Sequence, residues 1–192
     1  MFGVPSAGLW LLTVIVLAVS VRRHVDRLLA GVLALHWLWS GILYHWLYFA
    51  TINPAARLFA ILFAGQAGLF AWLGIMRGHL EFRWGRRLPQ VLGAVLIVYG
   101  LVYPALVVAS GLHWPRMPAF GVPCPTTLVT LGLLLELEPR APRALIVIPV
   151  IWALVGGSAA LLLGVLPDSM LLVGGAAALV AVISPRPLRR DS

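Results

Sequence analysis

Seven long apolar stretches limit what this chain can fold into. A transmembrane helix needs about 20 mostly apolar residues, because each residue rises about 1.5 Å against a hydrocarbon core of about 30 Å. The stretches contain few charged residues, and the fifth and the seventh are shorter than the others: 2–21, 28–50, 58–76, 88–112, 121–135, 144–166 and 170–183. The sequence therefore predicts an all-α, polytopic membrane helical bundle of seven transmembrane helices, with residues 1–192 forming a single integral membrane domain.

The composition excludes several other classes of protein. Charged residues make up 10% of the chain, whereas soluble domains average about 25%. The chain has one cysteine, so a fold held together by disulfides is excluded. All 14 basic residues are arginine. Without lysine there is no retinal Schiff base, and without a Cys-x-x-Cys-His motif there is no covalently attached haem.

The arginines predict how the chain is oriented in the membrane. Cytoplasmic loops carry the excess of basic residues, and alternating the seven stretches places 12 arginines on one side and only Arg57 and Arg116 on the other. The N-terminus is therefore predicted outside and the C-terminus inside. If 121–135 did not cross, the split would be seven to seven, so this stretch is predicted to cross. The basic charge is explained by topology and does not indicate a nucleic-acid partner.

The stretch from His36 to Tyr48 is rich in aromatic and polar side chains. At about 100° per residue, one helical face carries Tyr44 and Tyr48, with His45 at its edge. His36 and His45 are nine residues apart, about 13 Å along a helix and on opposite sides, so they cannot share a metal or a haem. Ionisable groups within a bilayer usually face an interior or a cavity, which makes His45 and Tyr48 candidate binding residues. The alternative is that both residues only pack.

A second candidate region lies between the fourth and fifth stretches. Tyr103 precedes Pro104, His113 follows, and Cys124 stands between two prolines at the start of a helix. Cys124 with His113 could bind a soft metal such as copper or zinc, or Cys124 could be a nucleophilic thiol with a histidine as base. The third alternative is an inert buried cysteine. No Cys-x-x-Cys or His-x-x-x-His motif supports the metal.

Two glutamates end the fifth stretch on the side predicted to be cytoplasmic. Glu136 and Glu138 lie close in sequence to Arg140 and Arg143. We therefore expect an ion pair at the membrane surface.

Three segments resemble one known family. They are the stretch from His36 to Ala55, which contains Asn53-Pro54; the stretch Phe120-Gly-Val-Pro-Cys-Pro-Thr-Thr127; and the stretch from Ile148-Pro149 through Trp152 and Gly156-Gly157-Ser158 to Asp168. Together they are similar to the bacterial multi-pass membrane proteins of domain-of-unknown-function family 6064, over about residues 20–184. The resemblance implies the bacterial plasma (inner) membrane as location, and it implies no activity.

These observations favour a carrier or binding protein for a small solute or a soft metal ion. Its site would lie in the outer half of the bilayer, and the substrate-binding candidates are His45, Tyr48, Tyr103, His113 and Cys124. Two alternatives remain open. One is a structural or accessory subunit, either in a homo-oligomer or in a larger, redox-linked membrane complex. The other is a small membrane enzyme that uses Cys124 with a histidine, and we favour a non-enzymatic role over it. The lipid bilayer is a partner in every case.

Overall fold

The structure is a computed structural model that describes residues 3–109 and 122–183. In these two ranges seven α-helices follow one another: α1 (Gly3–Ser20), α2 (Asp26–Trp39), α3 (Ala56–Phe70), α4 (Leu88–Ala109), α5 (Pro123–Leu135), α6 (Arg143–Leu163) and α7 (Met170–Ile183). Four shorter helical segments extend or join them: η1 (Ser40–Tyr48), η2 (Phe49–Thr51), η3 (Ala71–Met76) and η4 (Leu166–Ser169). Within the described ranges the only extended pairing is an isolated bridge between Phe82 and Leu137. The all-α prediction is confirmed.

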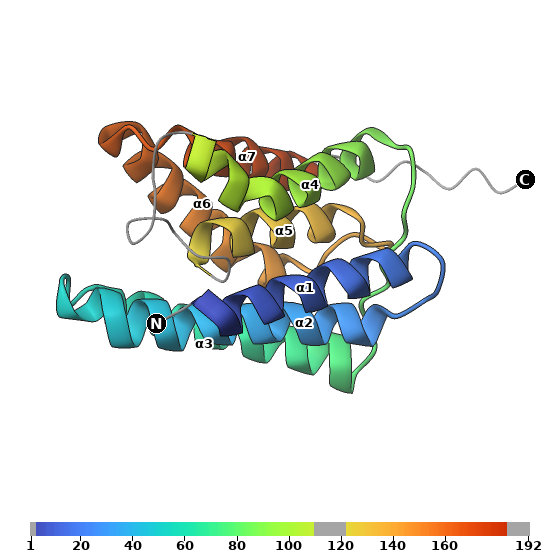
Figure 1. Cartoon of the computed structure of the whole chain (residues 1–192). Coiled ribbons are helices and arrows are strands. Elements are labelled where there is room, and N and C mark those ends of the chain that lie inside the picture. Colours follow the sequence, from blue (N-terminus) through green and yellow to red (C-terminus); the bar gives the residue numbers. More distant parts are fainter. Residues whose placement is uncertain (1–2, 110–121, 184–192) are drawn as a thin grey trace, which may run out of the picture.

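The helices form two layers with α5 between them (Figure 1). One layer contains α1, α2 and α3, the other contains α4, α6 and α7, and α5 contacts helices of both. Every residue from Pro125 to Leu135 is buried. The short fifth stretch of the sequence is thus the central helix of the bundle, where other helices surround it and lipid does not.

The helices agree in position with the seven apolar stretches, but they differ in length. Five are long and apolar enough to cross a membrane: Asp26–Thr51, Ala56–Met76, Leu88–Ala109, Arg143–Leu163 and Leu166–Ile183. Two apolar helices are shorter, Ser6–Ser20 and Pro123–Leu135. The chain is therefore a helical membrane protein with at least five membrane-length helices in its described part.

Local sequence explains where two of the helices begin and end. Pro123 begins α5, a position where the missing N–H of proline costs nothing. α6 ends at Leu163 because Gly164 follows with φ +70°, a left-handed conformation that glycine adopts without strain. The sequence prediction had extended this helix to residue 166, since the apolar run continues past the glycine.

Close contact between backbones holds α5 against α4. A Cβ atom added at Gly93 would lie 2.7 Å from the carbonyl oxygen of Gly132, and one added at Gly132 would lie 2.6 Å from that of Gly93. Neither distance leaves room for a side chain. Pairs of small residues allow such approach in membranes, where lipid supplies no hydrophobic force between helices.

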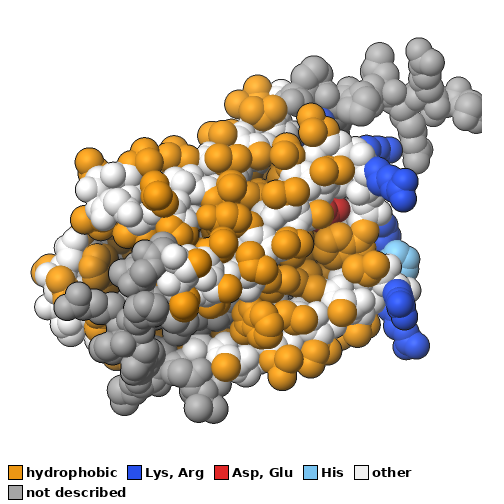
Figure 2. All heavy atoms as spheres, turned by 45° about the horizontal axis from the view of Figure 1, so that its top comes forward, with side chains coloured by type: hydrophobic (Ala, Val, Ile, Leu, Met, Phe, Trp, Pro, Cys, Tyr) orange, Lys and Arg blue, Asp and Glu red, His pale blue; other side chains and the backbone are white. Residues whose placement is uncertain are grey.

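Nine of the ten arginines in the described ranges lie at one end of the bundle, which we term the arginine end (Arg22, Arg23, Arg27, Arg77, Arg83, Arg86, Arg87, Arg140 and Arg143). Successive helices run in opposite directions, so the connections 21–25, 77–87 and 136–142 meet there (Figure 1). In Figure 2 the arginines gather at this end, and hydrophobic side chains cover most of the rest of the visible face. The arginines that alternate connections carry in the sequence are therefore gathered at one end of the folded bundle.

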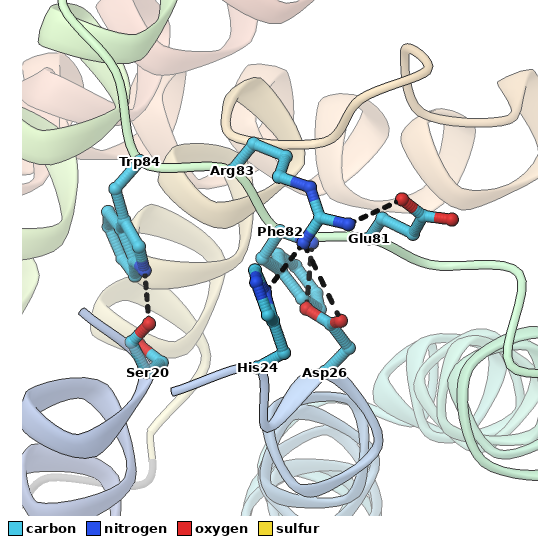
Figure 3. Close-up of polar contacts among 7 residues, drawn as sticks. All are labelled: Ser20, His24, Asp26, Glu81, Phe82, Arg83 and Trp84. Atoms are coloured by element: carbon cyan, nitrogen blue, oxygen red, sulfur yellow. Dashed lines mark hydrogen bonds and ion pairs between the residues drawn. The ribbon is translucent and has the colours of Figure 1, made fainter. Parts of the chain in front are cut away.

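Hydrogen bonds fasten these connections to one another (Figure 3). The backbone N–H of Phe82 donates to Asp26 Oδ1 at 2.9 Å, and the indole N–H of Trp84 donates to the carbonyl of Ser20 at 3.1 Å. Arg83 donates from Nη2 to Glu81 at 2.7 Å and from Nη1 to His24 Nδ1 at 2.8 Å. The segment between α3 and α4 is thereby tied to the start of α2.

We expect Asp26→Ala to destabilise the protein by about 1–3 kcal/mol, because a backbone N–H would lose a charged acceptor. Asp26→Asn keeps an oxygen acceptor for Phe82 and should recover part of the loss. The midpoint of thermal unfolding of the purified full chain in detergent measures both. Equal midpoints for wild type and Asp26→Ala would show that the bond to Phe82 contributes nothing.

Candidate binding site at the end opposite the arginines

A carboxylate beside a phenol and a thiol lies at the other end of α5. The hydroxyl of Tyr103 on α4 donates to Asp168 Oδ1, and the thiol of Cys124 at the start of α5 lies close to the same carboxylate. Asp168 lies in η4, between α6 and α7. Three separate parts of the chain thus meet at one acidic side chain.

The fold brings Asp168 to this position in two ways. Gly164 ends α6 and starts the turn, and the hydroxyl of Tyr99 donates to the carbonyl of Pro167 at 2.9 Å. Tyr99 and Tyr103 are four residues apart on α4, so they share one helical face and both reach η4. Tyr103 is 1% exposed, whereas Cys124 and Asp168 are partly exposed. The acid and the thiol therefore form a rim above a buried phenol.

His45 is buried beside this group without a hydrogen bond. Its side chain is 0% exposed, and its ring centroid lies 4.6 Å from that of Phe63 and 4.9 Å from that of Trp152, both edge to face. Neither ring nitrogen has a hydrogen-bond partner among the described residues. Buried polar groups are nearly always paired, so an unpaired one calls for an explanation such as a bound water, ion or ligand.

The other buried histidine on the same continuous helix makes a useful contrast. His36 Nε2 lies 2.7 Å from the hydroxyl of Thr13, and its side chain is 3% exposed. His36 is thus a buried packing histidine with a hydrogen-bond partner. The two side chains differ in environment although both are buried.

Trp152 connects His45 with the thiol. Its ring meets His45 edge to face, and its indole N–H lies close to the sulfur of Cys124. That buried N–H has no partner of good hydrogen-bonding geometry. We refer to Tyr103, Cys124, Asp168, Trp152 and His45 together as the Cys124 cluster.

Short polar side chains of α5 continue the Cys124 cluster into the bundle. The Thr126 hydroxyl lies 3.5 Å from that of Ser40, and Thr130 accepts a hydrogen bond from the indole of Trp37 at 2.9 Å. Thr127 is 0% exposed, and its hydroxyl lacks a partner in the described ranges. Polar contacts thus extend from the rim toward the middle of α5.

The structure brings three of the five predicted binding residues together: His45, Tyr103 and Cys124. Tyr48 does not join them, because its side chain is 52% exposed. The reason is the winding of η1, a π-helix, whose i→i+5 bonds turn the chain less per residue than the 100° assumed from the sequence. His45, predicted at the edge of the face that carries Tyr48, is therefore buried, and Tyr48 is exposed. His113 lies outside the described residues.

Two members of the Cys124 cluster were missed as binding residues. Asp168 carried a signal in the sequence, because it is the only acidic residue on the side predicted to be outside. Trp152 carried none, since a tryptophan within an apolar helix is indistinguishable from a packing residue. Its role is visible only where α6 packs beside η1.

The described residues restrict the chemistry of this site. They contain no group of three His, Cys, Asp or Glu side chains close enough to hold a metal ion. Copper or zinc bound by Cys124 and His113 therefore remains a prediction. Among the described residues His45 makes no hydrogen bond to Cys124, and an enzyme that uses Cys124 with a histidine also remains a prediction.

The two glutamates at the arginine end differ from each other. Glu138 pairs with Arg87 at 2.8 Å, an arginine from the preceding connection, whereas the sequence had suggested Arg140 or Arg143. Glu136 is 1% exposed, and its Oε2 has no hydrogen-bond partner within the described ranges. Burial, together with the nearby charge of Glu138, raises the pKa of Glu136 to about 7.

One comparison with known proteins gives a match. A family model described as "Family of unknown function (DUF6064)" matches residues 6–190. No curated protein and no solved structure matches the chain.

Proposed function

The chain belongs to the DUF6064 family, a family of unknown function, and we propose that it binds a small polar solute or a soft metal ion in the Cys124 cluster. The observation that carries this proposal is the buried, unpaired imidazole of His45 next to Trp152. An unmade hydrogen bond on a buried polar group costs about 1–3 kcal/mol. A bound ligand would remove that cost by supplying the missing partner.

The proposed topology is seven crossings, with the N-terminus outside and the bundle in a bacterial plasma membrane. The arginine end then faces the cytoplasm, as the positive-inside rule requires, and the Cys124 cluster lies in the outer half. α5 has only 13 residues, about 20 Å of helix. It tolerates this length because surrounding helices shield it from lipid.

The side chains of the Cys124 cluster favour certain ligands. Thiolate and imidazole are ligands of copper(I) and zinc. Such a metal would need Cys124 together with His113, because the described His, Cys, Asp and Glu side chains form no group of three that could hold it. The Asp168 carboxylate, with a phenol and an indole N–H, would also bind a small amine or amino acid. Because Asp168 and Cys124 are partly exposed, a ligand can reach them from the rim.

The position of His45 within a π-helix agrees with a binding role. π-segments within α-helices are rare and occur frequently at functional sites. η1 spans nine residues and holds His45 against Phe63 and Trp152.

Binding is tested by adding copper(I), zinc and a panel of small amines and amino acids to the purified full chain in detergent. At a concentration of 100 times Kd a ligand should stabilise the fold by about 2.7 kcal/mol, seen as a higher midpoint of thermal unfolding. Elemental analysis detects a metal that co-purifies. We expect Asp168→Asn and His45→Asn to abolish the response.

His36→Asn is the matched control, because it makes the same change on a buried histidine that is bonded to Thr13. It should leave the ligand response intact even if it lowers the midpoint. The proposal is wrong if no metal and no compound raises the midpoint, or if His36→Asn removes the response as fully as His45→Asn. A partner protein that co-purifies in fixed ratio would then favour the accessory-subunit alternative.

A further inference from the structure

A hollow of about 790 Å³ opens at the arginine end, between the start of α4 and the ends of α5 and α7. This volume is in the range of small-molecule sites, about 300–1,000 Å³. It arises where the shortest helix stops. α5 has 13 residues, against 22 in α4 and 21 in α6, so the space beyond its last turn is not filled by helix.

The inner wall of the hollow is apolar. Leu134 and Leu135 from α5, together with Ala181 and Val182 from α7, line it. The alanine leaves space where a larger side chain would fill the hollow. This wall is suited to hydrocarbon and offers little to a fully hydrated ligand.

The rim of the same hollow is charged. Arg83, Arg87 and Arg140 line it, and among the described residues the only acids that line it are Glu81 and Glu138. The lining therefore carries a net positive charge, and Figure 2 shows arginines gathered at this end of the molecule. A positive rim above an apolar wall matches an amphiphile with an anionic head.

We propose that this hollow binds one anionic phospholipid, with its phosphate at the arginines and an acyl chain along α5 and α7. Guanidinium groups bind phosphate oxygens through paired, charge-assisted hydrogen bonds. The ends of membrane-length helices lie at the level of lipid headgroups, and basic pockets between such helices on the cytoplasmic side bind anionic headgroups.

The ion pairs at the rim do not block a phosphate. The side chains of Arg87 and Glu138 are 76% and 44% exposed, and exposed pairs of this kind are worth about 0–1 kcal/mol. The Arg87 guanidinium also has five N–H donors, of which its pair with Glu138 uses one. A phosphate can thus share this guanidinium with the carboxylate or take the place of the carboxylate.

The hollow lies at the opposite end of α5 from Cys124. The lipid proposal therefore does not depend on a ligand in the Cys124 cluster. Failure of either proposal leaves the other unaffected.

The test titrates the purified full chain, in neutral detergent, with phosphatidylglycerol, phosphatidylcholine or inorganic phosphate. Native mass spectrometry counts the phospholipid retained, and the midpoint of thermal unfolding reports stabilisation. We expect one phosphatidylglycerol to be retained and to raise the midpoint, with little response to phosphatidylcholine. Each arginine contact removed should weaken binding roughly fivefold, so Arg87→Gln with Arg140→Gln should weaken it about 25-fold.

A second variant and a matched control make the test specific. Ala181→Phe fills the apolar wall without a change in charge, and it should also lower retention of phosphatidylglycerol. Arg22→Gln with Arg23→Gln removes the same charge from two exposed arginines of the same end that do not line the hollow, so it should retain the lipid. Three results would overturn the proposal: equal responses to both lipids, an equal loss in this control, or the same rise with inorganic phosphate.

Discussion

Alanine at position 74 is expected to lower the midpoint of thermal unfolding markedly. Gly74 lies in η3, and a Cβ atom there would stand 2.2 Å from the Cβ of Ala30 on α2 and 3.1 Å from Leu80 Cδ1. Ala30 is 0% exposed and Leu80 is 2% exposed, so neither can move without disturbing the core. Overpacking of this kind costs about 1–3 kcal/mol, which for a chain of this size lowers the midpoint by roughly 2–4 °C per kcal/mol.

A reciprocal change should restore the packing. In Ala30→Gly combined with Gly74→Ala the offending methyl group is gone, and the nearest remaining atom of residue 30 is its Cα at 3.6 Å, an ordinary contact. We expect the double variant to be more stable than Gly74→Ala, with a coupling energy of at least about 1 kcal/mol. Gly68→Ala is the control on α3, where nothing lies within 4 Å. This substitution should stabilise the helix by up to about 1 kcal/mol.

The same measurements decide whether the contact between α2 and η3 is as close as described. If Gly74→Ala and Gly68→Ala change the midpoint of thermal unfolding equally, α2 and η3 are further apart than the 2.2 Å between an added Cβ at Gly74 and the Cβ of Ala30 implies. A double variant no better than Gly74→Ala would show that the strain lies against Leu80. A full recovery locates it at Ala30.

The positions of the helices were predictable because each crossing leaves a long apolar run in the sequence. The predicted stretch 28–50 corresponds to the continuous helix Asp26–Thr51, and the predicted stretch 58–76 to Ala56–Met76. Helix ends were less predictable. α6 ends three residues before the predicted boundary because Gly164 adopts a left-handed conformation within a run that is still apolar.

The packing of the helices was harder to predict, for two physical reasons. Helix winding was assumed to be uniform, yet η1 is a π-helix, and this changes which side chains of the stretch from His36 to Tyr48 face inward. Amphipathic patterns are also weak when lipid and core are both apolar. For that reason nothing in the sequence marked α5 as the buried centre of the bundle.

The candidate site was partly predictable, because polar residues within apolar stretches are conspicuous. His45, Tyr103 and Cys124 were selected in this way, and the structure brings Trp152 and Asp168 to them. The conformation of the turn between α6 and α7 could not be predicted from the sequence. The sequence puts Asp168 on the side that is predicted to be outside, but only the packing of η4 against α4 shows that it meets Tyr103 and lies near Cys124.

The second large effect is expected from the pH dependence of stability, through Glu136. Burial raises the pKa of this carboxyl from about 4.5 to about 7, so the folded chain binds a proton there at pH values where the unfolded chain has released it. Stability then falls as the pH rises from about 4.5 to 7, and the loss is complete above about pH 7. A shift of this size corresponds to at most about 3 kcal/mol.

Glu136→Gln should remove this dependence, because glutamine stays neutral and keeps a donor and an acceptor in the same place. We expect the variant to match wild type below about pH 4 and to exceed it near pH 8 by about 3 kcal/mol. Glu81→Gln is the control, since this glutamate lies at the same end but is half exposed and paired with Arg83. Equal pH profiles for wild type and Glu136→Gln would mean that Glu136 is ionised in the folded state. Its buried Oε2 atom, which has no hydrogen-bond partner among the described residues, would then have a partner that stabilises the charge.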